Sequence, residues 1–395
     1  MARILKFPKN FLWGSATSSH QVEGDNIHND WWEAEQAGKL KYKSGKACDH
    51  YNQYEQDFDL IKKLNQNAYR FSIEWSRIEP REGEFNQKEI EYYRKMLLAL
   101  KKRDIKIMLT LHHFTTPLWL AKKGDWANPK VIFYFSRFAE RVFNEYQDLV
   151  DFWVTINEPF SVYATHGYLL GVFPPKKRNP ILFLKVVKNQ IIVHKKIYKI
   201  FHKLKPDIKV GIAKNNAYFE PYFSKSPLDK LSVALAHYFG NEYFLNKIKN
   251  YQDFIGLNYY FHRKILFPFF EKNENKIKSD LNWEIYPKGI YYVLKELKKY
   301  QKPVYITENG LADAKDRLRK DFIKDHLFWI HKAIEEGVDV RGYFHWSLMD
   351  NFEWAEGFSP RFGLIEIDYK TMERKPRSSA YYYAKICKEN QLCFG

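Results

Sequence analysis

Two short segments place a glutamate where a buried strand would open into a loop. Residues 155–159 carry Glu158 and residues 306–310 carry Glu308, each at the end of an apolar, β-branched run. Cleavage of a glycosidic bond needs two such carboxyl groups, one to protonate the leaving oxygen and one to attack the sugar. The two glutamates lie 150 residues apart in the chain. Only a fold that gathers distant strand ends at one face brings them together.

Eight short apolar runs predict the strands of such a fold. Most are continuous rather than alternating, which is typical of strands covered on both faces. Between them lie stretches with helical spacing, for which Asn86 is a candidate N-cap and Pro129, Pro287 and Pro376 are candidate first-turn residues. The predicted strands are residues 11–17, 68–75, 105–113, 152–158, 209–214, 254–260, 303–308 and 340–347.

The alternation of strand and helix predicts an α/β protein, a single (β/α)8 TIM barrel that forms one catalytic domain over residues 1–395. A doubly wound open sheet is the alternative, but it calls for a glycine-rich phosphate turn after the first strand, which residues 14–16 do not provide. In a barrel, the chemistry lies at the C-terminal strand ends. Those ends are rich in polar and aromatic residues, namely Arg70, Glu74, His112, His113, Asn157, Glu158, Asn258, Tyr260, Glu308, His345 and Trp346.

Roles for the residues around the two glutamates follow from the same chemistry. Arg70 would keep Glu308 ionised for attack, and Tyr260 would donate a hydrogen bond to the same carboxylate. Two neighbouring carboxyl groups raise the pKa of one of them, which favours a protonated Glu158 as the general acid. Gly310 is expected to let the chain turn sharply after Glu308. The alternative is that the two glutamates are unrelated surface residues.

The stretch from 344 to 354 is suited to holding a sugar. Trp346 and Trp354 offer flat apolar faces, and Glu353 between two aromatic residues offers a carboxylate to sugar hydroxyls. Gln21 could likewise offer its side-chain amide to sugar hydroxyls. Core packing of the tryptophans and loop hydrogen bonding by Gln21 are the alternatives. His112 and His113 lack a metal-binding spacing, so we expect neither a metal nor a cofactor.

The composition restricts partners and location. The net charge of +17 comes mostly from lysines spread along predicted helices, whereas nucleic-acid binders gather basic residues on one face, so we expect no nucleic acid. Three cysteines without metal spacing favour a reducing compartment. Neither a signal peptide nor an apolar window of about 18 residues is apparent. The prediction is a cytoplasmic protein without a transmembrane segment.

Five ordered motifs resemble glycoside hydrolase family 1, the retaining β-glucosidase and β-galactosidase family. They are residues 11–24, 69–78, the two glutamate segments and 346–364. Residues 111–117 are similar to archaeal, heat-loving members, and abundant Lys and Glu with few Met is typical of thermophiles, as it is of AT-rich genomes. The resemblance implies that Glu158 is the acid/base and Glu308 the nucleophile. It places the sugar among Gln21, His113, Asn157, Tyr260, Trp346, Glu353 and Trp354.

The activity that this resemblance implies is retaining hydrolysis of terminal β-glucosyl residues through a covalent glycosyl-enzyme. β-Galactosides are expected as further small-molecule substrates, and β-mannosides stay open. A 6-phospho-β-glycosidase and a catalytically silent sugar-binding relative are the alternatives. Phosphoglycosidases of the family usually carry small and basic residues in place of the Glu353-Trp354 pair, so this pair favours unphosphorylated sugars. The natural leaving group and the oligomeric state stay open.

Residues 265–270 form a strongly apolar segment with three alternative roles. The segment packs at the rim of the barrel, lines an apolar channel for the leaving group, or contacts a membrane surface or a partner subunit. Rim packing is the simplest of these interpretations.

Overall fold

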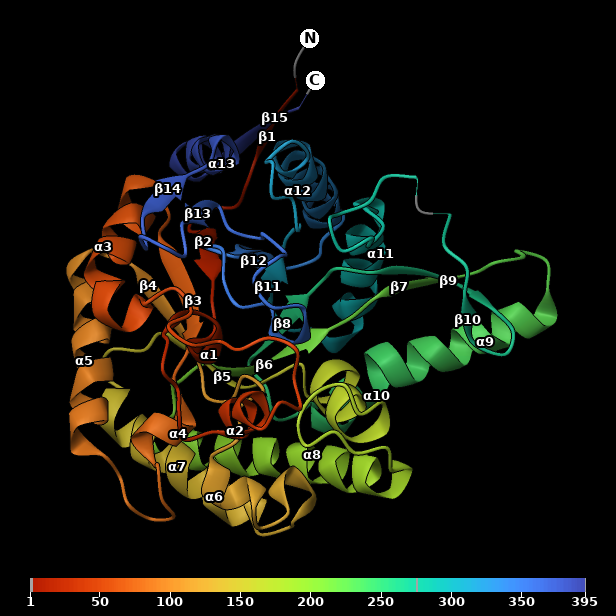
Figure 1. Cartoon of the computed structure of the whole chain (residues 1–395). Helices are drawn as coiled ribbons and strands as arrows, with labels where there is room; N and C mark the ends of the chain where they lie inside the picture. The colour runs from red at the N-terminus through yellow and green to blue at the C-terminus, as the bar shows by residue number, and fades with distance from the viewer. Residues whose placement is uncertain (1–2, 275, 395) are drawn as a thin grey trace.

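Within residues 3–274 and 276–394, which the computed structural model describes, eight parallel strands close into a barrel (Figure 1). Each strand coincides with one predicted run, with ends that differ by at most three residues, which confirms the predicted (β/α)8 fold. The order around the barrel is β2-β3-β4-β5-β6-β8-β11-β12, and β12 pairs back to β2. The strands are β2 (Leu12–Ala16), β3 (Ala68–Ser72), β4 (Lys106–Thr110), β5 (Phe152–Asn157), β6 (Val210–Asn215), β8 (Phe254–Asn258), β11 (Val304–Asn309) and β12 (Val340–Trp346).

The barrel strands are apolar on both faces because each lies between two cores. Residues that point into the barrel form one cluster, which includes Ala16, Ala68, Met108, Val154 and Phe344. Residues that point outward pack against the helices in a second, larger cluster. Burial on both faces explains why the strands appear in the sequence as continuous apolar runs.

Helices surround the barrel and follow its strands in turn (Figure 1). The helix predicted after Asn86 is confirmed, because the Asn86 side chain accepts a hydrogen bond from the Lys88 N–H at 3.1 Å and caps α5. Pro376 instead ends the short strand β14, and the last helix begins at Ser378. The surrounding helices are α3 (His50–Lys63), α5 (Gln87–Lys102), α7 (Val131–Tyr146), α8 (Pro180–Leu204), α9 (Pro227–His237), α10 (Tyr243–Ile248), α11 (Lys288–Leu297), α12 (Arg319–Glu335) and α13 (Ser378–Glu389).

Shorter elements connect strands to helices or pair near the chain ends. Strand β1 (Arg3–Lys6) pairs with β15 (Gln391–Phe394), and β13 (Ile365–Ile367) with β14 (Arg374–Pro376). The short helices are α1 (Ser19–Val22), α2 (Asp30–Gln36), α4 (Trp75–Ile78), α6 (Leu118–Ala121), η1 (Asp125–Ala127), η2 (Pro159–Leu169), η3 (Tyr238–Glu242), η4 (Lys298–Tyr300) and η5 (Trp354–Glu356). Among the described residues, no helix combines the length and apolarity that a membrane span requires.

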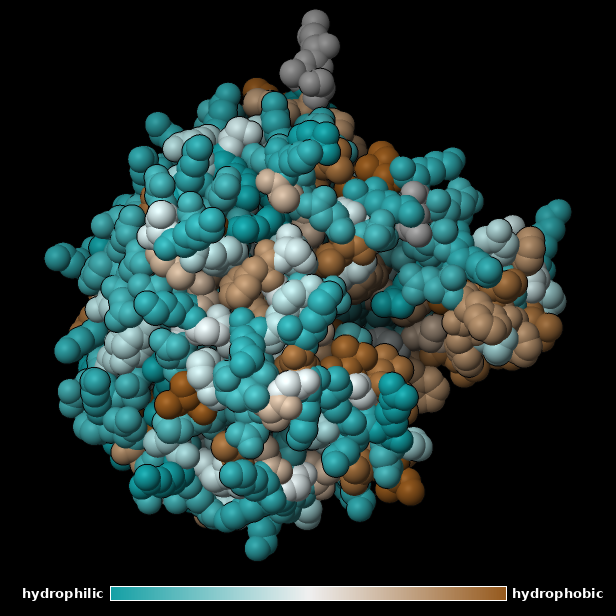
Figure 2. All heavy atoms as spheres, in the orientation of Figure 1, coloured by the Kyte–Doolittle hydropathy of each residue, from teal (hydrophilic) through white to brown (hydrophobic). Residues whose placement is uncertain are grey.

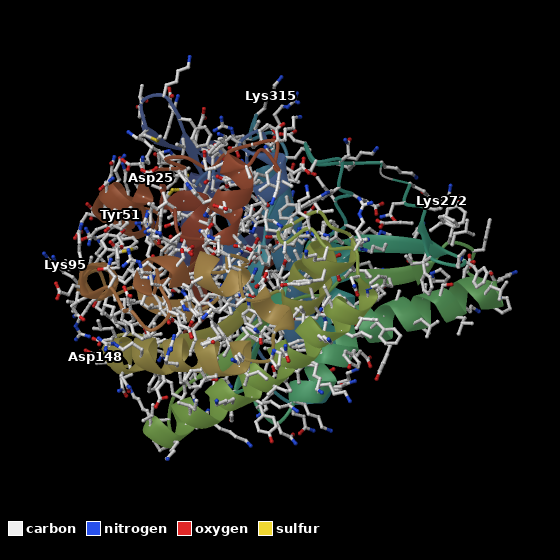
Figure 3. All side chains as sticks on the ribbon, turned by 60° about the horizontal axis from the view of Figure 1, so that its bottom comes forward. Asp25, Tyr51, Lys95, Asp148, Lys272 and Lys315 are labelled. Carbon is white, nitrogen blue, oxygen red and sulfur yellow. The ribbon has the colours of Figure 1, made fainter. Side chains whose placement is uncertain are left out.

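A side lobe projects from the barrel beside β6 and β8 (Figures 1 and 3). It consists of α9 and a three-stranded sheet in the order β10-β9-β7. The strands are β7 (Tyr218–Pro221), β9 (His262–Leu266) and β10 (Phe270–Glu271). The apolar segment 265–270 therefore forms the β9–β10 connection on this lobe. Ile265 is buried, but Phe267, Phe269 and Phe270 are exposed, so rim packing accounts for only part of the segment.

Gly310 permits a close approach between two strand ends rather than a sharp turn. A Cβ atom on Gly310 would lie 1.7 Å from the backbone carbonyl oxygen of Trp346, the last residue of the neighbouring strand β12. The φ angle of Gly310 is not in the left-handed region. Any side chain at this position would therefore separate the strand ends that carry Glu308 and Trp346.

Replacement of Gly310 by alanine is expected to destabilise the protein by about 3 kcal/mol or more, because the new methyl group overlaps a backbone atom that cannot rotate away. Thermal unfolding of Gly310→Ala against the wild type measures the loss. Gly240→Ala is the control, since its Cβ would meet only the Phe219 ring, at 3.2 Å. Equal Tm values for Gly310→Ala and the wild type would contradict this interpretation.

Candidate active site

Glu158 and Glu308 lie in one cavity of about 200 Å³ at the C-terminal ends of the barrel strands. Glu158 directly follows β5, and Glu308 belongs to β11. The φ angle of Glu158 is 45°, in the left-handed region, after which Pro159 begins η2. This conformation costs a non-glycine residue about 1–2 kcal/mol, and it marks the point where the chain leaves the barrel. The fold thus unites the two glutamates, as predicted.

Glu308 is held by a cation and a phenol. Its carboxylate accepts a hydrogen bond from Arg70 Nη1 at 2.5 Å and one from the Tyr260 hydroxyl at 2.9 Å. Arg70 is fully buried and also donates to Asn157 Oδ1 at 2.6 Å. Burial and the charge of Glu308 hold the pKa of Tyr260 well above its usual value, so the phenol remains a donor. Both supporting residues predicted for Glu308 therefore contact it.

Glu158 has only neutral hydrogen-bond partners. Its Oε1 accepts from the side-chain amides of Asn258 at 2.8 Å and Asn215 at 3.1 Å. Burial and the charge of Glu308 raise the pKa of Glu158 to about 7, although the two amides and Arg70 oppose this shift. At neutral pH Glu158 therefore retains a proton for a large part of the time, while Glu308 is paired with Arg70.

Most of the predicted sugar-binding residues line the same cavity as the two glutamates. His113 lies almost parallel to both Trp346 and Trp354, with interplanar angles of 20° and 14°. The Gln21 amide nitrogen lies 3.3 Å from Glu353 Oε2. Burial and the charge of Glu308 raise the pKa of Glu353 to about 8, so this carboxyl group is mostly protonated at neutral pH. It can then donate as well as accept hydrogen bonds.

His113 is joined to Asn157, and through Arg70 to Glu308. Burial and the charge of Arg70 hold the pKa of His113 well below its usual value, so its ring is neutral. The Asn157 amide nitrogen lies 3.1 Å from His113 Nε2 and can donate to it. Arg70 and Gln21 lie behind the cavity wall, whereas the other eight predicted residues line it: His113, Asn157, Glu158, Tyr260, Glu308, Trp346, Glu353 and Trp354.

Other polar strand ends do not take part in the cavity. Glu74 accepts hydrogen bonds from the hydroxyl groups of Ser19, Ser76 and Thr115, and thus holds loops in place. His112 packs among Trp126 and other aromatic rings. In the part of the chain that the structure describes, no group of three or more His, Cys, Asp and Glu side chains is arranged to hold a metal ion.

Sequence reasoning assigned no role to two asparagines that contact Glu158, although it placed Asn258 among the polar strand ends. Asn258 donates to both Glu158 and Asn157, and its own oxygen accepts from the Thr307 hydroxyl at 2.6 Å. Asn215 donates to Glu158 from the end of β6. The position of Asn258 as the last residue of β8 is the signal that pointed to it.

Comparison with known proteins decides the family. Residues 4–254 and 245–392 match the family model described as Glycosyl hydrolase family 1. The chain belongs to this family. Among curated family members, Beta-glucosidase A of Thermotoga maritima is 38% identical, with 98% of this chain and 99% of that protein covered. A 6-phospho-beta-galactosidase of Staphylococcus haemolyticus is 31% identical, with 98% and 99% covered.

Solved structures of the family have the same fold. A beta-glycosidase from Pyrococcus horikoshii is 43% identical, with a TM-score of 0.93 over 99% of this chain and 96% of that one. The family 1 β-glucosidase from Thermotoga maritima also has a TM-score of 0.93, at 36% identity over 98% and 99%. These relatives confirm the expected likeness to the heat-loving members of the family.

Loss of the Asn258 side chain is expected to lower kcat/KM for β-glycosides roughly 10- to 100-fold. The variant Asn258→Ala removes hydrogen bonds to Glu158 and to Asn157. A hydrogen bond between neutral groups contributes about 0.5–1.5 kcal/mol, and one to a charged carboxylate about 1.5–3 kcal/mol. Steady-state kinetics at constant pH measures the effect.

The matched control is Asn216→Ala, which truncates another buried asparagine that lies just beyond a barrel strand and does not line the cavity. We expect this variant to retain most of the activity. If the two variants lost activity equally, a general effect on folding would explain both, and the positioning role of Asn258 would be wrong.

Proposed function

We propose that this protein hydrolyses unphosphorylated β-glycosides with retention of configuration. Glu308 serves as the nucleophile and Glu158 as the acid and base. The observation that carries the proposal is the unequal environment of two carboxyl groups in one cavity: Glu308 is paired with Arg70, whereas burial and the charge of Glu308 raise the pKa of Glu158 to about 7. Catalysis by two carboxyl groups requires one ionised and one protonated group.

In the first step, a Glu308 oxygen attacks the anomeric carbon and the bond to the leaving oxygen breaks. Glu158 transfers its proton to that oxygen, and the products are a free alcohol and a glycosyl ester of Glu308. Asn157 reaches the sugar from beside Glu158, where it can contact the 2-hydroxyl. Arg70 and Tyr260 hold the attacking carboxylate in place as its charge is consumed.

In the second step, Glu158 is ionised and takes a proton from water. The water oxygen attacks the anomeric carbon, the ester bond to Glu308 breaks, and the sugar leaves with its original β configuration. The charge of Glu308 disappears while the ester exists, and the pKa of Glu158 falls accordingly because that charge helped to raise it. The same residue can therefore act first as an acid and then as a base.

The cavity lining favours neutral sugars over phosphorylated ones. Glu158, Glu308, Glu353 and Glu356 line the cavity, and its described lining includes neither lysine nor arginine. A 6-phosphate carries up to two negative charges and would face these carboxyl groups without compensation. We also propose β-glucosides as the first substrates and β-galactosides as further ones, in line with relatives named beta-glucosidase and beta-galactosidase.

A cytoplasmic location remains a proposal that rests on the three cysteines, all of which are free.

Release of 4-nitrophenol from the β-glucoside, β-galactoside, β-mannoside and 6-phospho-β-glucoside tests the proposal. We expect turnover of the unphosphorylated glucoside and a loss of at least 1,000-fold in Glu308→Gln, which removes the attacking oxygen anion. Glu74→Gln is the control, because Glu74 is a buried glutamate at another strand end and does not line the cavity. A folded protein that binds glucose but cleaves none of the four substrates would instead be a silent sugar-binding relative. Preference for the phosphorylated substrate would make it a phosphoglycosidase.

The rate of the first step is expected to fall as the pH rises through about 7, because Glu158 must be protonated to act as the acid. The variant Glu158→Gln cannot lose a proton, so it should lack this alkaline limb while it slowly cleaves substrates with acidic leaving groups. Rates measured from pH 5 to 9 with wild type and variant show the difference. An unchanged alkaline limb in Glu158→Gln would assign the titration to another group.

A further inference from the structure

One lysine of the barrel is buried close to the candidate acid. Lys214, the last residue but one of β6, is 1% exposed. Hydrophilic residues cover much of the face shown in Figure 2, and Lys203 and Lys209, which precede the same strand, are exposed. A buried ammonium group is costly, and an apolar residue would suit a strand that lies between two cores. The position of Lys214 therefore indicates a use for its charge.

The alternation of side chains along β6 places Lys214 behind the wall of the catalytic cavity. Ala213 belongs to the cluster inside the barrel, and Ile212 to the cluster outside it. Successive side chains of a strand point to opposite faces, so Lys214 points outward and Asn215 points back inward. Asn215 lines the cavity and donates to Glu158 Oε1 at 3.1 Å. The lysine thus directly precedes a residue that contacts the acid.

The ammonium group of Lys214 joins three elements. It donates to two backbone carbonyl oxygens at 2.5 Å each, that of Asn215 at the end of β6 and that of Gly240 in η3. The Ser161 hydroxyl of η2 accepts from it at 3.3 Å and lies 3.2 Å from the same Asn215 carbonyl oxygen. The three N–H bonds of the ammonium group therefore find three acceptors, which fix the backbone of Asn215 against two helices.

These acceptors are neutral, which distinguishes Lys214 from buried guanidinium groups of the protein. Arg70, Arg319 and Arg374 each pair with a carboxylate. Burial lowers the pKa of Lys214 to about 7, although the charge of Glu158 opposes this shift. The attraction is mutual, so a charged ammonium group favours the ionised form of Glu158.

The other ionisable residues on the elements around Lys214 are neutral, exposed or paired elsewhere. On η2, burial lowers the pKa of one histidine and raises the pKa of two tyrosines: His166, Tyr163 and Tyr168. On η3 there are an exposed tyrosine and a glutamate that pairs with a histidine and a lysine: Tyr238, Glu242, His237 and Lys299. The neighbouring strands, residues 152–157 and 254–258, carry no ionisable side chain. Glu158 is therefore the charged group with which Lys214 interacts.

We propose that Lys214 is a positioning residue for the acid and base of the reaction, Glu158. Its ammonium group holds Asn215 at the end of β6, and its positive charge supports Glu158 whenever that carboxyl group is ionised. This support matters most in the second step, when the ester has removed the charge of Glu308 and Glu158 acts as the base. The inference rests on the proposed hydrolase function, because it assigns a role within the same reaction.

The variant Lys214→Met removes the ammonium group and keeps an unbranched side chain. We expect the pKa of Glu158 to rise in both steps, because a nearby positive charge is lost. For phenyl β-glucoside, whose leaving group needs a proton, the alkaline limb of kcat/KM should move to higher pH by about 0.5–1 unit. For 2,4-dinitrophenyl β-glucoside, whose leaving group needs none, kcat reports the second step, and its acidic limb should move in the same direction.

Two further variants complete the experiment. Lys209→Met is the matched control, because it removes the same charge from an exposed lysine directly before β6. We expect both limbs to stay in place in this control. Lys214→Gln keeps N–H donors without the charge, so it should show the same upward shifts as Lys214→Met, and it serves the measurement if the methionine variant does not fold.

A purely structural role for Lys214 gives a different result. It would lower the rates of Lys214→Met and Lys214→Gln at every pH and leave both limbs in place, which would overturn the proposal. Failure of both variants to fold, while Lys209→Met folds, would also overturn it. In either case the wild type still cleaves both glucosides and the hydrolase function stands. A folded wild type that cleaves neither glucoside would reject the hydrolase function and the proposal with it.

Discussion

One buried cation, Arg70, sets the electrostatics on which the candidate active site depends. Its guanidinium contacts Glu308 and Asn157, whereas Glu158 accepts hydrogen bonds from two neutral amides and Glu353 lies beside the amide of Gln21. A buried carboxylate is stable only where a charge or several donors compensate it. The single guanidinium therefore favours a charge at Glu308, and that charge in turn helps to keep protons on Glu158 and Glu353. The different protonation of Glu158 and Glu308, which are residues of the same type, therefore follows from their surroundings.

The barrel supplies the rigidity that this arrangement needs. The ends of the strands β11, β8, β5 and β3 are joined by a continuous set of hydrogen bonds that runs from Thr307 through Asn258 to Asn157 and on to Arg70. The close contact of Gly310 with the backbone of Trp346 draws the end of β11 against that of β12. As a result, Glu308, Arg70 and Trp346 are all held by one closed sheet.

The barrel and the meeting of Glu158 and Glu308 in one cavity could be predicted because their signals are local. Strands buried on both faces give continuous apolar runs, and Glu158 and Glu308 each stand at the end of one. Asn258 carries the same kind of signal as Glu74, a polar residue at a strand end, yet only Asn258 contacts Glu158 and Asn157. That difference depends on which way each side chain points after the strand, and spacing does not encode it. The lobe escaped prediction for a related reason, since β7, β9 and β10 are short and form only through contacts between distant segments.

The most direct test of the central claim is to identify the residue that becomes bonded to the sugar. A 2-deoxy-2-fluoro-β-glucoside with an acidic leaving group is suited to this. The fluorine slows both the formation and the hydrolysis of the glycosyl-enzyme, whereas the acidic leaving group speeds its formation alone, so the intermediate accumulates. Mass spectrometry of the digested protein should find one sugar, attached to the peptide that carries Glu308. Attachment at Glu158 or Glu353, or rapid turnover of natural substrates without any trapped sugar, would contradict the assignment of roles.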